Sequence, residues 1–160
     1  MFYKNVFNPN ISASPSTKFG IVVAEFNRHF TEEILNRSLK TFEEKGAKIA
    51  KILWVPGAYE LAFGAQMLLD QGIDAVLVIG VVIRGDTSHY DHVCDAVTQG
   101  VLRVSLDYKK PVMFGVLTCE NEKQVEERIS KGEDLAIATI QMGNLVDKNR
   151  LPILLESILL

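Results

Sequence analysis

The loop from Arg84 to His89 contains the residues of this sequence that are best suited to chemistry. A glycine and small hydroxyl residues follow an apolar run there and lead into a predicted helix. Free backbone N–H groups at the start of a helix bind anions, aided by the helix dipole. The carboxylate of Asp86 opposes an anion, but that side chain can point to solvent or cap the helix. Spacing alone leaves two interpretations open, an anion-binding loop and an N-capped turn without a ligand.

Three histidines could transfer protons near neutral pH, because an imidazole titrates in that range. They are His29, His89 and His92, and only its place beside the anion loop distinguishes His89. A surface or helix-capping role is the alternative for each. His89 and His92 share a helical face at i, i+3, but no third ligand stands nearby, so we expect no metal site.

Aromatic and acidic residues follow two other predicted strands. Phe26 and Tyr59 could stack on a flat heterocycle, or they could form the rim of the core. Glu60 could accept hydrogen bonds from a ligand, or lie at a helix start because the dipole favours a carboxylate there. Phe114 stands near the start of a strand, and Arg128 stands on the charged face of the next helix. The pattern alone favours a core residue for the first and a solvated i, i+4 partner for the second.

Apolar runs that alternate with helical patterns predict the scaffold for these residues. Strands are expected at 19–24, 49–55, 75–83 and 112–118, and helices at 31–45, 58–71, 90–108, 121–131 and 133–148. This alternation predicts right-handed βαβ units. The expected class is α/β, a three-layer α/β/α, flavodoxin-like fold with a four-stranded parallel sheet in the order 2-1-3-4. Because ligands bind beyond the carboxyl ends of such strands, the loops after the first three strands should converge on one crevice.

The length of 160 residues fits one domain. Residues 1–17, rich in Pro, Ser and Asn, predict an extended N-terminal arm, and residues 18–150 predict the α/β domain. Residues 151–160 form an apolar C-terminal tail that could be an extra interface helix or poorly ordered.

Composition excludes several classes of protein. A net charge of −3 does not favour binding to nucleic acid, which requires a basic surface patch. The apolar run 75–83 is far shorter than the ~20 residues that span a bilayer, and the N-terminus does not resemble a signal peptide. Two cysteines without ligand spacing indicate a reducing compartment, so we expect a cytoplasmic protein. The 48% hydrophobic content fits a buried subunit interface or a somewhat apolar monomer equally well.

Taken together, these segments resemble the lumazine synthase (6,7-dimethyl-8-ribityllumazine synthase) family from about residue 18 to about residue 146. The combination of a proline-glycine-aromatic-glutamate turn with an arginine-glycine loop that ends in histidine-tyrosine is highly specific. The matching residues include Phe26-Asn27, Pro56-Gly57-Ala58-Tyr59-Glu60, Arg84-Gly85-Asp86-Thr87-Ser88-His89-Tyr90, Phe114 and Glu127-Arg128.

The resemblance implies an enzyme of the penultimate step of riboflavin biosynthesis, without cofactor or metal. Its reaction condenses 5-amino-6-(D-ribitylamino)uracil with 3,4-dihydroxy-2-butanone 4-phosphate to give 6,7-dimethyl-8-ribityllumazine, phosphate and water. The roles that the resemblance implies are proton transfer by His89, pyrimidine binding by Phe26, Asn27, Ala58, Tyr59, Glu60, Val81, Val82, Ile83 and Phe114, and phosphate binding by Gly85, Asp86, Thr87 and Arg128.

The resemblance also implies homopentamers, in some members assembled into icosahedral shells, with Phe114 and Arg128 serving the neighbouring subunit. The family's N-terminal arm adds to a neighbour's sheet, and riboflavin synthase is a further partner that the resemblance suggests. One departure is the short connection from Arg128 to Glu133, which leaves open whether Lys131 takes the place of a family lysine near the phosphate.

Two other functions remain open from the sequence. A catalytically silent binding or shell protein of the same fold is one, although every residue of the expected site is present. An FMN-binding electron carrier is the other, but the segment Glu25-Phe26-Asn27-Arg28 replaces the Ser/Thr-rich phosphate loop that such a carrier needs.

Overall fold

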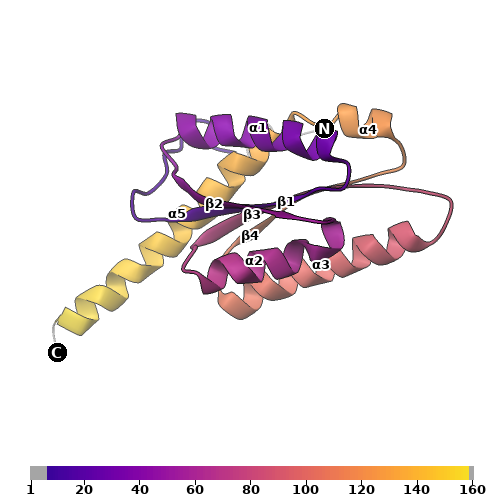
Figure 1. Ribbon diagram of the computed structural model, residues 1–160. Coiled ribbons are helices and arrows are strands. Elements are labelled where there is room, and N and C mark those ends of the chain that lie inside the picture. The colour runs from indigo at the N-terminus through magenta and orange to yellow at the C-terminus, as the bar shows by residue number, and fades with distance from the viewer. Residues whose placement is uncertain (1–6, 159–160) are drawn as a thin grey trace.

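Figure 1 shows the computed structural model, which describes residues 7–158, with side chains described through residue 147. The sheet consists of β1 (Phe19–Ala24), β2 (Ile49–Val55), β3 (Ala75–Ile83) and β4 (Val112–Cys119). These strands pair in parallel in the order β2-β1-β3-β4. All six residues of β1 are buried, because this strand lies inside the sheet and helices cover both of its faces. The predicted strand order and fold class are confirmed.

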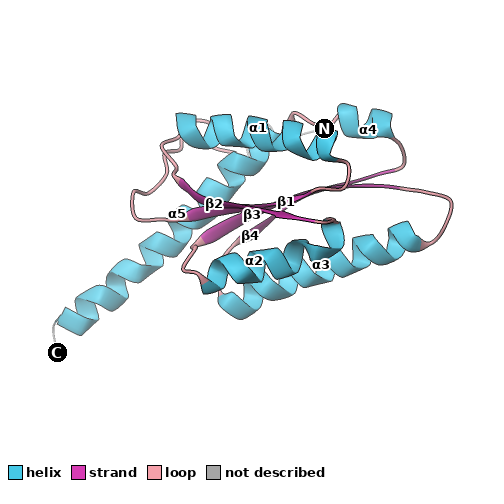
Figure 2. Cartoon of the chain, viewed as in Figure 1, coloured by secondary structure: helices cyan, strands magenta, loops and turns pink. Residues whose placement is uncertain are grey.

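Helices cover the sheet in two layers, as Figure 2 shows. On one side lie α1 (Arg28–Glu44) and α5 (Lys131–Ile158), which pack against each other. On the other side lie α2 (Leu61–Asp70) and α3 (His89–Tyr108). Two short helices, η1 (Ala58–Glu60) and α4 (Glu122–Glu126), follow the ends of β2 and β4. No helix in the described part of the chain is long and apolar enough to cross a membrane.

Each face of the sheet has its own apolar core, because successive side chains of a strand point to opposite sides. On one face Ile21 and Val23 of β1 pack in a cluster that includes Phe42 of α1. On the other face Val22 belongs to a cluster that includes Leu61 of α2. The continuous apolar runs of the sequence therefore supply both cores at once.

The connection between β4 and α5 differs from the sequence prediction. Instead of a helix over 121–131, α4 has only five residues, and Arg128 lies in the turn that follows it. The next helix begins at Lys131 and packs on α1. The two backbones approach so closely that a Cβ at Gly132 would lie only 2.7 Å from the Ile34 carbonyl oxygen, so this position needs glycine. The buried Ser38 hydroxyl lies 2.9 Å from the carbonyl oxygens of Ile34 and Gly132.

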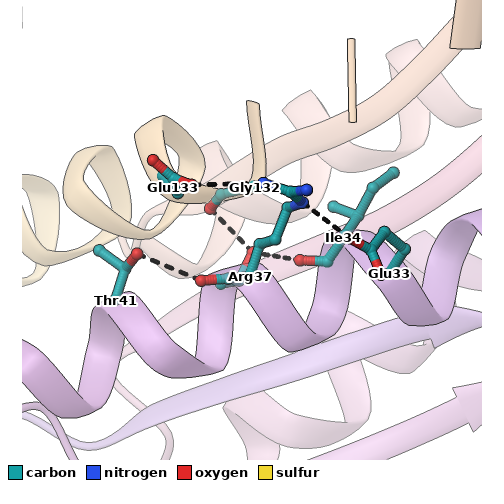
Figure 3. Close-up of polar contacts among 7 residues, drawn as sticks. Glu33, Ile34, Arg37, Thr41, Gly132 and Glu133 are labelled. Carbon is teal, nitrogen blue, oxygen red and sulfur yellow. Dashed lines mark hydrogen bonds and ion pairs between the residues drawn. The ribbon is translucent and has the colours of Figure 1, made fainter. Parts of the chain in front are cut away.

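Figure 3 shows the polar contacts around this junction. Arg37 of α1 donates to Glu33 at 2.9 Å and lies 3.5 Å from Glu133 at the start of α5. These contacts fix the start of α5 against α1 directly after the short connection.

The last helix is longer than the predicted 133–148. Its backbone continues to Ile158, past the sheet and away from the rest of the molecule (Figure 1). Residues 159 and 160 lie outside the described residues.

Part of the expected N-terminal arm is held against α5 of the same chain. The Asn144 carboxamide accepts from the Ser14 N–H at 2.8 Å and donates to the Ser12 carbonyl at 2.9 Å. The Asp147 carboxylate accepts from the Ser14 and Ser16 hydroxyls, the latter at 2.8 Å. Residues 1–6 of the arm lie outside the described residues.

Candidate active site

β3 extends past β1 at the carboxyl end of the sheet. The last pair between these strands joins Val23 to Ile79, whereas β3 stays paired with β4 as far as Ile83 and Cys119. One edge of Gly80–Ile83 therefore has no strand beside it. The boundary between β1 and β3 is also where the chain connections change direction, and open α/β sheets bind ligands at that point.

A crevice of about 680 Å³ lies there, a size that suits a small ligand. Its walls come from the loops after β1, β2 and β3 and from the start of α3, so the three loops converge as expected. The lining residues are Phe26, Pro56, Gly57, Ala58, Tyr59, Glu60, Val81, Val82, Ile83, Gly85, Thr87, His89, Tyr90 and Val93.

Two aromatic rings stand exposed at this crevice. Phe26 is 71% exposed and Tyr59 is 65% exposed, although most rings of this size are largely buried. The Phe26 N–H donates to the Pro56 carbonyl at 2.9 Å, which ties the loop after β1 to the end of β2. Exposed aromatic faces beside a cavity are suited to stacking on a flat ligand.

Asn27 and Glu60 hold the backbone of the crevice in place. Asn27 has φ 59°, a left-handed conformation that asparagine tolerates, and its Nδ2 donates to the Val81 carbonyl at 2.9 Å. Asn27 therefore stands behind the crevice wall and not among the lining residues. Glu60 Oε2 accepts from the Gly57 N–H at 2.9 Å. Its other carboxylate oxygen can accept a hydrogen bond from a ligand.

Gly80 allows the loop after β2 to approach β3. A Cβ at this position would lie 2.9 Å from Leu61 Cδ1 and 3.4 Å from Ala58 Cβ. The absence of a side chain thus lets η1 pack directly over β3, which brings Tyr59 and Glu60 to the crevice.

The loop after β3 presents unpaired backbone donors. Within residues 7–158, no hydrogen bond is found for the backbone N–H groups of Gly85, Asp86 and Thr87. Ser88 precedes α3 without a side-chain cap, and Thr87 Oγ1 accepts from the His89 N–H at 3.3 Å. Of the two interpretations of this loop, the geometry favours the anion site, because the N–H groups near the helix start stay available.

The three histidines differ in their position relative to the crevice. His89 lines it at the first position of α3. His29 lies on α1 with its ring 4.0 Å from that of Phe30, and His92 is exposed one turn further along α3. Neither of these two is among the described residues that line the crevice. No group of three or more His, Cys, Asp or Glu side chains in the described chain could hold a metal.

Phe114 and Arg128 lie outside this crevice, as far as the described lining residues show. Phe114 is opposite Val78 in the middle of the sheet, far from the carboxyl end of β4, and it is 37% exposed. Arg128 follows α4 and donates to the Gln124 carbonyl at 2.8 Å. Their roles in the site therefore stay predictions that need a neighbouring subunit.

Arg128 and Lys131 lie close to one another near the end of β4. Burial raises the pKa of the Cys119 thiol, and the positive charges of Arg128 and Lys131 oppose that shift. Both positive charges therefore lie near the Cys119 thiol, on the face of the sheet that carries α1 and α5.

Known proteins match this chain over most of its length. The model of the 6,7-dimethyl-8-ribityllumazine synthase family matches residues 16–147. This chain belongs to that family. A protein of that name from Parabacteroides distasonis is 40% identical over 153 residues, which cover 89% of this chain and 96% of the relative. Another from Bacteroides fragilis is 44% identical over 137 residues, covering 81% and 96%. The family and the enzyme class predicted from the motifs are confirmed.

Four lining residues were not predicted as part of the site. Pro56 and Gly57 belong to the same turn as the predicted Ala58, and Tyr90 and Val93 lie on α3. Val93 stands four residues after His89, so helical spacing from the histidine could have revealed it. Burial raises the pKa of the Tyr90 hydroxyl, which keeps this side chain neutral beside the crevice.

Proposed function

We propose that this crevice is the site where the enzyme condenses 5-amino-6-(D-ribitylamino)uracil with 3,4-dihydroxy-2-butanone 4-phosphate. The carrying observation is the combination of two exposed aromatic rings with a loop of unpaired N–H groups and His89 in a single crevice. A flat heterocycle, an anion and a proton-transfer group are what this reaction requires. The product, 6,7-dimethyl-8-ribityllumazine, is formed in the penultimate step of riboflavin biosynthesis.

The pyrimidine occupies the side of the crevice next to β1 and β2. Phe26 stacks on its face, while Glu60 accepts hydrogen bonds from its N–H groups. The backbone edge of Val81–Ile83 offers polar groups on the side that β1 leaves uncovered. Ala58 and Tyr59 close the opposite wall, and Asn27 supports the site from behind through the Val81 carbonyl.

The phosphate of the second substrate binds at the loop Gly85–Ser88. Backbone N–H groups of Gly85, Asp86 and Thr87 donate to its oxygens, and the start of α3 favours its negative charge. Arg128 adds a charged donor from a neighbouring subunit, with Lys131 beside it as a second cation. Phe114 of a neighbouring subunit closes over the pyrimidine.

The reaction proceeds by proton transfers that His89 can assist. The pyrimidine amine attacks the ketone, and water leaves as the imine forms. Elimination then releases phosphate, and closure of the second ring releases another water. General acid–base catalysis of this kind contributes about 10²–10⁴-fold. Holding both reactants together supplies a larger share of the acceleration. No step in this sequence needs a metal or a cofactor.

The enzyme works as a homo-oligomer, with a pentamer as the expected unit, because Phe114 and Arg128 stand outside their own crevice. Apolar side chains on the outer surface of α2 and α3 support a subunit interface. Phe63 is 67% exposed on α2, and Leu102 and Leu106 are 59% and 66% exposed on α3. Exposed apolar groups in this number indicate contact with another protein surface.

We place the enzyme in the cytoplasm, where its two cysteines stay reduced. Riboflavin synthase is the proposed protein partner, because it consumes the product. Neither nucleic acid nor a membrane takes part. By the family resemblance we expect the N-terminal arm to add to a neighbour's sheet.

A fluorescence assay tests the proposal directly. The purified full chain is mixed with both substrates, and the fluorescent lumazine and free phosphate are followed together. We expect equal amounts of the two products. Phosphate release without lumazine, or no turnover with folded protein, would contradict the proposal and favour the catalytically silent alternative. Light scattering of the same sample measures the assembly.

A further inference from the structure

Arg84 is the residue of the expected anion loop that the proposed reaction does not use. Its backbone N–H donates to the Cys119 carbonyl at 2.9 Å, so the β3–β4 ladder fixes its position. Its side chain leaves the crevice: among the described residues, 7–158, Arg84 does not line it, although Gly85, Thr87 and His89 do.

The Arg84 guanidinium contacts both segments that flank the loop. Its Nε donates to Glu120 at 2.8 Å, directly after β4. Its terminal nitrogen lies 3.2 Å from Asp91 in the first turn of α3, and its central carbon lies 4.2 Å from the centre of the Tyr90 ring. The hydrogen bond to Glu120 raises the pKa of Arg84, so the charge is present at every working pH.

The loop inside this clamp has little else to define its shape. The N–H groups of Gly85, Asp86 and Thr87 have no partner among the described residues, and a Cβ at Gly85 would touch nothing within 4 Å. The loop is therefore fixed mainly at its two ends. Arg84 connects the two ends of the loop. Its backbone directly precedes Gly85, and its side chain contacts Tyr90 and Asp91 at the start of α3.

We propose that Arg84 is a positioning residue, which together with Glu120 and Asp91 holds the loop Gly85–Ser88 so that its N–H groups and His89 face the crevice. The clamp acts through the loop and does not touch substrate. This inference rests on the proposed function, since it assigns the phosphate-bearing substrate to that loop.

Two variants test the clamp, and Glu120→Gln also distinguishes it from direct phosphate binding by Arg84. In Arg84→Gln and Glu120→Gln, we expect KM for the phosphate substrate to rise about tenfold, because a loosely held site loses affinity. KM for the pyrimidine should change less than about twofold. If Arg84 instead attracted phosphate directly, Glu120→Gln would remove a competing negative charge and lower that KM. An unchanged or lowered KM in Glu120→Gln overturns the proposal.

Two further measurements separate this inference from the proposed function. Arg84→Lys keeps the charge but loses the planar fork, so its KM should lie closer to that of Arg84→Gln than to that of the wild type. Amide hydrogen exchange of residues 85–91 needs no turnover and should be about tenfold faster in Glu120→Gln. Arg103→Gln is the matched control, because it breaks an exposed ion pair with Asp107 elsewhere on α3. Equal exchange in Glu120→Gln and Arg103→Gln overturns the clamp even if the wild type makes lumazine, and a wild type without turnover contradicts only the proposed function.

Discussion

The crevice and the surface around Arg128 are built in different ways. In the crevice, strand ends, a helix start and backbone hydrogen bonds fix each group, and Asn27 and Gly80 serve only to bring backbones together. Arg128, in contrast, lies in a turn after a helix of five residues, with its charge near Glu127 at 3.5 Å. The first region is held in place by its own chain, whereas we propose that the second functions only where another subunit meets it. Four predictions test this difference.

The largest effect is expected for His89→Ala. Loss of general acid–base catalysis should lower kcat by about 10²–10⁴-fold, while both KM values stay within about threefold. Steady-state kinetics with the fluorescent product measures this. His92→Ala, on the same helix but away from the crevice, is the control and should keep wild-type kcat. A His89→Ala enzyme that binds both substrates but has no detectable turnover would contradict the assisting role.

Arg128→Ala should act on affinity. A lost charge-assisted hydrogen bond of about 1.5–3 kcal/mol corresponds to a rise of about 10–100-fold in KM for the phosphate substrate. KM for the pyrimidine should not change, because the crevice that each chain forms by itself remains intact. Lys123→Ala on α4 removes a nearby exposed charge and serves as the control. An unchanged KM in Arg128→Ala would remove this residue from the site.

Mixed oligomers test whether the two regions meet across subunits. His89→Ala and Arg128→Ala chains are co-expressed in equal amounts and purified together. With random mixing, about a quarter of the sites receive an intact His89 from one chain and an intact Arg128 from its neighbour. At concentrations of the phosphate substrate far below the KM of Arg128→Ala, where that variant alone is nearly inactive, we expect about a quarter of wild-type activity. Activity no higher than the mean of the two separate variants would show that each site uses one chain only.

The smallest effect concerns the stability of the crevice itself. Asn27→Ala removes the bond to the Val81 carbonyl and places alanine at φ 59°, which should cost about 1–2 kcal/mol of unfolding free energy. Asn27→Gly relieves the left-handed strain and should lose less. Glu127→Ala, at the exposed Arg128 surface, should change stability by less than about 0.5 kcal/mol. Chemical denaturation compares the three variants, and equal losses in all of them would contradict the contrast between the regions.

Much of the fold could be predicted because its signals are local. The apolar runs that form β1 and β3 are continuous, and their alternation with helices leaves few parallel topologies. The convergence of three loops on one crevice follows from the strand order. The place of Arg128 could not be predicted in the same way. The chain turns after α4 and α5 packs on α1 at Gly132, a long-range contact that no local pattern reveals.

For the site, the sequence predicted the positions of some residues but not the contacts of others. Phe26, Tyr59 and His89 follow strand ends, so topology alone brings them to the crevice. Substrate binding by Asn27 stays a prediction, and the hydrogen bond of its Nδ2 to the Val81 carbonyl could not be predicted, because it depends on how the loop after β1 lies against β3. The role of Arg84 was hidden for a related reason, since its partner Glu120 lies 36 positions away in the sequence.

The unequal lengths of β1 and β3 set a fixed distance along the crevice. β3 continues for the residues Gly80–Ile83 beyond its last pair with β1, and four residues of strand span about 13 Å. Side chains around the crevice can change how tightly a molecule is held, but the distance from the end of β1 to the anion loop is set by main chain. In the proposed reaction the pyrimidine and the phosphate belong to different substrates, so this overhang sets how far apart the two bound molecules lie, whatever residues line the walls.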